Sequence, residues 1–133
     1  MKWPYIKLPG SADPTLRPLV EVTLATKRKI TPELLFLLDS GSDYTYADYS
    51  IGLWLGINFS KVNKVKSIAA NNKPFYSYPA ITNLEIKGHK VRMLIHYTQE
   101  FGGMGLLGQE SVFDKFKIIF ERYNWSFQIR PYK

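Results

Sequence analysis

The feature that most constrains this chain is an apolar run that stops at a carboxylate. Residues 33–38 read Glu-Leu-Leu-Phe-Leu-Leu, and five turn-forming residues, Asp39-Ser40-Gly41-Ser42-Asp43, follow at once. A continuous apolar run of this length predicts a strand buried on both faces. Asp, Ser and Gly in succession predict a tight turn. Because an unpaired carboxylate at the end of a buried strand is costly, Asp39 is a candidate functional residue.

A second short motif, Leu106-Leu107-Gly108, lies far downstream, just before a short amphipathic helix predicted over residues 110–116. A lone Asp-Ser-Gly is a common turn and carries little information. When a buried strand precedes it and an apolar-apolar-Gly element follows later in the chain, the combination is much more specific. The two motifs are therefore interpreted together.

Short alternating runs separated by turn residues make up most of the remaining sequence. A hairpin is predicted over residues 65–79 with Asn71-Asn72 at its tip, because Asn tolerates the left-handed backbone of a tight turn. A helix is predicted over residues 47–55, ended by Gly56. The other predicted strands are 19–24, 81–86, 91–96, 117–121 and 125–129. Many short strands and two short helices indicate a mainly β fold.

Composition excludes several functional classes. The chain has 133 residues, of which 45% are hydrophobic, and this suits one domain with a core of its own. Zero cysteines exclude a disulfide scaffold, a cysteine nucleophile and a thiolate metal site. The two histidines, His89 and His96, are too few for a histidine metal cage. His89 is expected to lie at a hairpin turn, and His96 is expected to be a structural residue of a strand.

The charge pattern bears on partners and location. The formal net charge is +7, but the cations are spread along the chain apart from small clusters at residues 27–29 and 61–66. This distribution is typical of a solvated surface, so nucleic acid is not expected as a partner. No apolar run reaches the roughly 20 residues of a membrane span, and the N-terminus lacks the apolar stretch of a signal peptide. We expect no membrane partner and a cytoplasmic protein, or a domain released from a larger intracellular protein.

The paired motifs resemble those of the retropepsin-like aspartic proteases, whose signature is two apolar residues, Asp, Thr or Ser, Gly, and Ala or Ser. The resemblance extends from about residue 18 to residue 131. It implies an acid-protease barrel with a flap hairpin and one or two short helices. It also implies that Asp39 is the catalytic aspartate, with Ser40 and Gly41 beside it.

The same resemblance implies a set of substrate-binding residues. Asp43 matches an aspartate that contacts the substrate backbone in this family. The hairpin over residues 65–79 matches the flap, and Leu106 lies in the family's second apolar-apolar-Gly element. The substrate-binding residues expected on this basis are Asp43, Ile68, Ala69, Ala70 and Leu106.

The sequence also departs from the family pattern. The family's downstream glycine is often followed by an arginine that pairs with the aspartate aligned to Asp43, whereas Gln109 stands here. Retroviral flaps have glycine-rich tips, whereas this tip carries Asn71-Asn72. Ser42, where many family members have alanine, is closer to the pepsin form. None of these changes removes the catalytic aspartate.

The chemistry implied by the resemblance requires two carboxylates, and this chain contains Asp-Ser-Gly once. An active protein is therefore expected to be a homodimer in which Asp39 of each subunit meets on the two-fold axis. The expected activity is hydrolysis of a peptide or protein substrate by activated water, with no metal and no cofactor. Residues 18–133 are the expected protease domain. Residues 1–17 form a separate N-terminal segment that either joins the dimer interface, folds over the barrel or stays loose.

Other interpretations remain open. The fold could be retained as a catalytically inactive peptide-binding or dimerisation module. A small basic barrel could bind nucleic acid through Lys61, Lys64, Lys66 and Lys73 with neighbouring aromatic residues. Asp39 could be only a turn residue, and Asp43 could be the N-cap of the following helix. Tyr76 and Tyr78, on the returning arm of the predicted flap, either cover a substrate or pack.

Overall fold

The structure is a computed structural model that describes residues 1–132. Its strands are β1 (Lys2–Pro4), β2 (Ile6–Lys7), β3 (Leu16–Arg17), β4 (Leu19–Ala25), β5 (Leu34–Leu38), β6 (Tyr46–Asp48), β7 (Val65–Ile68), β8 (Pro74–Ile86), β9 (His89–Thr98), β10 (Gly105–Leu107), β11 (Phe116–Glu121) and β12 (Ser126–Pro131). The helical segments are α1 (Tyr49–Trp54), short 3-10 turns at Phe59–Lys61 and Arg122–Asn124, and a kinked segment at Gln109–Phe113. The protein is mainly β, as the sequence predicts.

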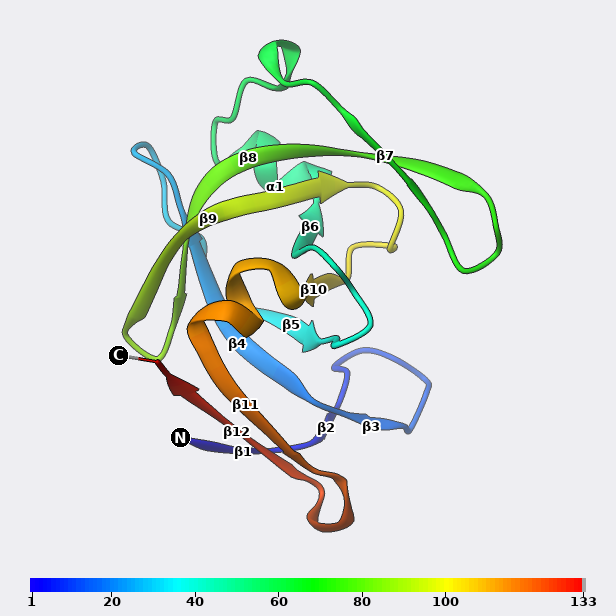
Figure 1. The fold of residues 1–133 in the computed structure, drawn as a ribbon, viewed down its shortest axis with the longest axis vertical. Helices are drawn as coiled ribbons and strands as arrows, with labels where there is room; N and C mark the ends of the chain where they lie inside the picture. The colour runs from blue at the N-terminus through cyan, green and yellow to red at the C-terminus, as the bar shows by residue number, and fades with distance from the viewer. Residues whose placement is uncertain (133) are drawn as a thin grey trace.

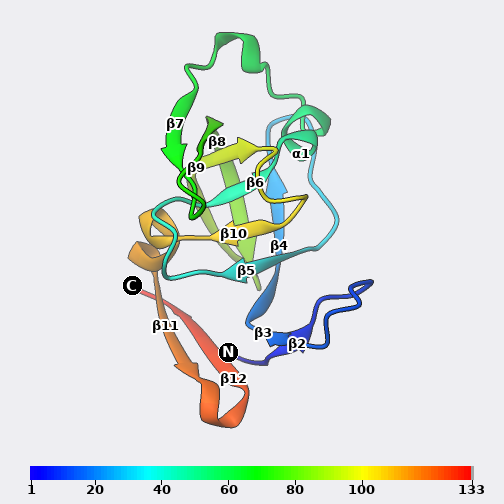
Figure 2. The same cartoon turned by 90° about the vertical axis from the view of Figure 1, so that its right-hand side faces the viewer.

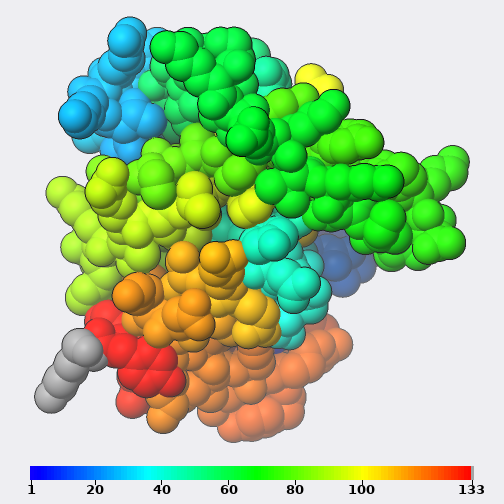
Figure 3. All heavy atoms as spheres, turned by 45° about the horizontal axis from the view of Figure 1, so that its top comes forward, coloured from blue at the N-terminus to red at the C-terminus, as the bar shows by residue number. Residues whose placement is uncertain are grey.

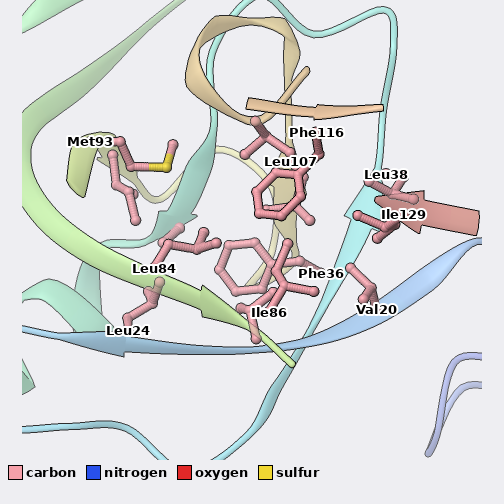
Figure 4. Packing of buried hydrophobic residues seen from close by; sticks show 14 of the residues in the cluster. Val20, Leu24, Phe36, Leu38, Leu84, Ile86, Met93, Leu107, Phe116 and Ile129 are labelled. Atoms are coloured by element: carbon pink, nitrogen blue, oxygen red, sulfur yellow. The ribbon is translucent and has the colours of Figure 1, made fainter. Parts of the chain in front are cut away.

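Six strands close into a barrel in the order β4-β5-β10-β6-β9-β8, because β8 also pairs with β4, while β7 extends the sheet beyond β8 (Figure 1). Closure removes the unpaired edges that an open sheet would leave. Because side chains alternate between the two faces of a strand, one face of each strand lies inside the barrel. The buried cluster there includes Leu24, Phe36, Leu84 and Ile86 (Figure 4). This is the acid-protease barrel expected from the sequence.

A second sheet, in the order β1-β12-β11, packs beside the barrel. The ring of Trp3, in β1, stacks on that of Phe127, in β12, with centroids 5.6 Å apart. Trp3 is buried, so the start of the chain folds onto the C-terminal hairpin. Residues 6–17 then form a small hairpin, β2–β3, that leads into β4.

Local turn signals predict two features correctly. Gly56 has a φ of 85° directly after the last turn of α1, a conformation that favours glycine. Asn72 has a φ of 66° at the tip between β7 and β8, where the Asn72 N–H donates to the carbonyl of Ala69. The polar turn that follows β4 is closed by a hydrogen bond from the N–H of Thr26 to the carbonyl of Lys29.

Three local predictions are wrong. β8 is one strand of 13 residues shared by two hairpins, because Pro79 stays in register opposite His96 instead of ending a hairpin. The helix over 110–116 is a kinked segment, since Ser111 has a φ of 70° and β11 already begins at Phe116. β5 is buried only at Phe36 and Leu38, and Leu37 is partly buried against a smaller cluster.

The helix α1 is capped by Asp48, whose carboxylate accepts a hydrogen bond from the N–H of Ser50. The alternative that Asp43 caps this helix is therefore wrong. Among residues 1–132, no helix is both long enough and apolar enough to cross a membrane.

Candidate active site

Asp39 is the first residue after β5, and the two sequence motifs meet around it. β5 pairs in parallel with β10, with Leu38 opposite Leu107. The Asp39 N–H continues this pairing by donating to the carbonyl of Leu107 over 3.0 Å. Figure 2 shows β5, β10 and β6 side by side, with the loop that joins β5 to β6 beside the β7–β8 hairpin. Parallel pairing of segments distant in sequence thus brings Gly108 next to the Asp-Ser-Gly turn.

The turn itself fixes the Asp39 carboxylate. The Gly41 N–H donates to Oδ1 of Asp39 over 2.9 Å, and the Ser42 N–H donates to the Asp39 carbonyl over 3.1 Å. Asp39 is half-buried, whereas Ser40 and Gly41 are exposed. The carboxylate therefore has one bond to the backbone and remains accessible to a ligand.

The loop of residues 39–45 is fastened to the chain after β10. Backbone N–H groups of Gln109 and Glu110 donate to the carbonyls of Ser42 and Asp43. The side-chain amide of Gln109 donates to the Ser40 carbonyl over 2.7 Å. Gln109 thus holds the loop by a hydrogen bond where the family pattern has an arginine, and the sequence alone did not reveal this role.

A cleft of about 570 Å³ opens beside the Asp39 carboxylate. The predicted residues Asp39, Gly41, Asp43, Ile68, Ala69, Ala70 and Leu106 all line it, whereas Ser40 does not. The sequence analysis missed seven further lining residues: Ser42, Tyr44, Tyr46, Lys66, Ser67, Phe75 and Phe101. Figure 3 shows the β7–β8 hairpin projecting from the body of the protein on the side of this loop.

Aromatic rings connect the hairpin to the floor of the cleft. Tyr46, Phe75 and Leu106 are buried together in a cluster separate from the barrel core. The ring centroid of Tyr46 lies 5.8 Å from that of Phe75 and 5.1 Å from that of Phe101. Burial raises the pKa of Tyr46, although a hydrogen bond from Ser67 opposes the shift. The hairpin therefore lies against the cleft as a packed wall.

Strand alternation decides which hairpin residues face the cleft. Phe75 and Ser77 are buried and point inward, so Tyr76 and Tyr78 point to the opposite face, where they line a separate pocket with Tyr49. The interpretation that Tyr76 and Tyr78 cover a substrate beside Asp39 is not supported by this geometry. Ile68 lines the rim of the cleft but is 60% exposed.

Thr45 provides a hydrogen bond that aligns the two motifs. Its buried Oγ1 accepts a hydrogen bond from the N–H of Gly108 over 3.1 Å. Replacing Thr45 by valine keeps the shape but leaves that N–H without its partner. We expect a loss of about 1–3 kcal/mol in the free energy of unfolding, measured by urea denaturation. Thr45→Ser retains the hydroxyl and is expected to lose less; equal losses for the two variants would contradict the assignment.

No family model matches this sequence, and no curated protein matches it. The fold is nevertheless that of a known structural class, the retropepsin-like barrel. The chain is similar to the crystal structure of a retropepsin-like aspartic protease from Rickettsia conorii, with a TM-score of 0.64. The alignment covers 96% of this chain and 97% of that chain at 14% sequence identity. At this identity the similarity establishes the fold alone.

Proposed function

We propose that this protein is an aspartic endopeptidase that works as a homodimer. The observation that carries the proposal is the position of Asp39, whose carboxylate is held by the Gly41 N–H at one side of a cleft walled by the β7–β8 hairpin. Since the sequence contains Asp-Ser-Gly once, each chain supplies one carboxylate. A second copy related by a two-fold axis would supply the other.

The proposed chemistry follows from two carboxylates in close proximity, which share one proton because two like charges cannot both ionise there. The ionised carboxylate takes a proton from a water molecule, and the water oxygen attacks the scissile carbonyl carbon. The protonated carboxylate, Asp39 of the partner subunit, donates its proton to the carbonyl oxygen. When the C–N bond breaks, the carboxyl that took the water proton gives it to the nitrogen, which leaves as an amine. One hydroxyl of the tetrahedral diol returns its proton to the other carboxylate, and the carbonyl carbon becomes a carboxyl group. The scheme uses no metal, cofactor or covalent intermediate.

The proposed substrate is an extended peptide that binds as an additional strand between the floor of the cleft and the hairpin. The walls contributed by Tyr46, Phe75 and Leu106 are apolar, so apolar side chains are expected on both sides of the cut. Asp43 lines the same cleft, and its proposed role is to accept hydrogen bonds from substrate N–H groups.

Cleavage of a mixed peptide library, followed by mass spectrometry between about pH 3 and about pH 7, tests this function over the range in which carboxylate dyads titrate. The protein concentration is varied in parallel, and the oligomeric state is measured by sedimentation. We expect cuts between apolar residues, with a specific activity that rises as dimer forms. Binding of peptides by a dimer that cuts none of them at any pH would favour the inactive peptide-binding module.

Leu106 provides a test of substrate preference. It is 8% exposed on the floor of the cleft, so Leu106→Ala enlarges the apolar subsite that it lines. At one position beside the cleaved bond, we expect the preference to shift towards larger side chains. The kcat/KM for a larger side chain, relative to that for the side chain preferred by wild type, should rise about tenfold. The measurement repeats the library digestion with the variant. Ile81→Ala, an exposed change on β8 away from the cleft, is the control, and an unchanged preference for Leu106→Ala would contradict the subsite.

A further inference from the structure

His96 lies directly behind the cleft wall, and the proposed chemistry does not use it. It belongs to β9 and is 4% exposed. Its Nδ1 lies 3.0 Å from the Oγ of Ser77, which is fully buried in β8. Its ring stacks on Tyr44, with centroids 4.1 Å apart and planes 15° from parallel. One imidazole therefore contacts both the loop of residues 39–45, through Tyr44, and β8, through Ser77.

The two partners of His96 belong to the candidate site. Tyr44 lines the cleft, and its carbonyl accepts a hydrogen bond from Oγ of Ser42. Ser77 pairs with Val65 at the base of the β7–β8 hairpin. The backbone N–H of His96 also donates to the backbone carbonyl of Thr45 over 2.9 Å. A movement of the His96 ring would therefore displace both Tyr44, in the loop of residues 39–45, and Ser77, at the base of the hairpin.

The groups that face the His96 ring are uncharged. From the loop of residues 39–45 and from β6, the rings of Tyr44 and Tyr46 face it. From β8, the Ser77 hydroxyl faces it and Pro79 is its register partner, and neither of these side chains is titratable. No carboxylate among these contacts can balance an imidazolium, so the neutral ring is the form that this environment accepts.

We propose that neutral His96 is a positioning residue of the site, holding Tyr44 against the cleft and Ser77 at the hairpin base, and that its protonation in acid releases both. The activity part of this inference rests on the proposed peptidase function. The structural part, which concerns the movement of Tyr44 and of the hairpin base, does not.

The direction of the acid effect follows from burial. Burial lowers the pKa of His96 from 6.5 to about 4, so the unfolded chain binds this proton at higher pH than the folded chain does. The stability associated with the neutral ring is fully present above the unfolded value and is lost as the pH falls from 6.5 towards 4. The acid side of the stability profile is therefore expected to depend on His96.

A titration followed by NMR tests the structural part on Asp39→Asn protein, which cannot complete a catalytic dyad. We expect the His96 ring protons and the Tyr44 ring protons to shift together at a midpoint well below 6.5. His89, which is exposed in the same strand, provides a second histidine signal for comparison. A midpoint for His96 at or above 6.5, or Tyr44 signals that ignore the titration, would overturn the proposal.

His96→Gln tests the link to activity, because glutamine can still bond to Ser77 but does not titrate. In wild-type protein we expect KM to rise about tenfold or more as His96 protonates, since Tyr44 leaves the cleft wall. In His96→Gln the KM should stay flat through the same acid range. If KM rises identically in both proteins, the carboxylates control the rise of KM in acid, and the proposal is overturned.

Two further results keep this test decisive. Should His96→Gln fail to fold, Ser77→Ala provides the alternative, because it removes the hydroxyl partner and should shift the NMR midpoint of His96. A midpoint unmoved by Ser77→Ala would also overturn the proposal. Should the wild type cut no peptide, the peptidase function fails, while the coupled NMR titration still decides whether His96 positions Tyr44.

Discussion

Asp39→Asn protein is expected to cut peptides at least about a thousandfold more slowly than wild type, as removal of an essential catalytic group generally does. Asparagine has nearly the same shape and retains an oxygen that can accept the Gly41 N–H, so the loop should stay in place. It cannot accept a proton from water, so general-base catalysis is lost. Initial rates on one identified substrate, together with urea denaturation, measure both effects.

The control for this result is Asp43→Asn, which changes a carboxylate in the same cleft without removing the proposed catalytic group. We expect it to weaken substrate binding while leaving chemistry measurable. If Asp39→Asn retains wild-type rates, Asp39 is only a turn residue and the proposed mechanism is wrong. If Asp43→Asn abolishes cleavage as completely as Asp39→Asn does, the assignment of Asp43 to substrate binding alone is wrong.

Mixing Asp39→Asn chains with wild type extends the same prediction to the dimer. Each productive site needs two intact copies of Asp39, so random pairing with a tenfold excess of inactive chain should lower wild-type activity about tenfold. The experiment requires substrate in excess and time for subunits to exchange. Activity that is independent of added Asp39→Asn chain would show that one chain cuts alone, which the single Asp-Ser-Gly does not allow.

Gly108→Ala is expected to destabilise the folded protein by about 3 kcal/mol or more, because it overpacks a backbone contact that cannot relax cheaply. A Cβ at this position would lie 2.1 Å from the carbonyl oxygen of Tyr44 and 2.7 Å from that of Ser42. Relief would require the chain after β10 to move away from the loop of residues 39–45. That movement would break the hydrogen bond from the Gln109 N–H to the Ser42 carbonyl.

Urea denaturation of Gly108→Ala measures the loss, and Gly103→Ala is the matched control. Gly103 has a φ of 89° but nothing within 4 Å of the added methyl, so only backbone strain opposes the alanine. That strain is about 1–2 kcal/mol for a residue in the left-handed region. A smaller loss for Gly108→Ala than for Gly103→Ala would contradict the close approach of the two motifs.

Several parts of this protein are determined by local sequence. The apolar run before Asp39 forms β5, and the Asp-Ser-Gly turn ends it. Asn72 adopts a left-handed conformation at a hairpin tip, and Gly56 does so after a helix. In each case the preference belongs to one residue and its neighbours, so the sequence pattern is sufficient to predict it.

Side-chain direction was harder to predict. As aromatic residues of the predicted flap, Tyr76 and Tyr78 are candidates to cover a substrate, yet Phe75 lines the cleft beside Asp39 and they do not. Successive side chains of a strand point to opposite faces of the sheet. A shift of the register by one residue therefore exchanges the side chains on the two faces. The sequence alone does not say which face the barrel will bury. Lys66 and Ser67, which line the cleft, carried no distinctive signal for the same reason.

The sequence by itself determined the mainly β class and the carboxylate turn that follows β5. Only the tertiary structure decided that β8 runs unbroken through two hairpins, that β10 pairs in parallel with β5, and that Gln109 fastens the loop. It also placed His96 between Tyr44 and Ser77. These features depend on pairing and burial between residues far apart in the chain, for which no local preference of either partner gives a signal.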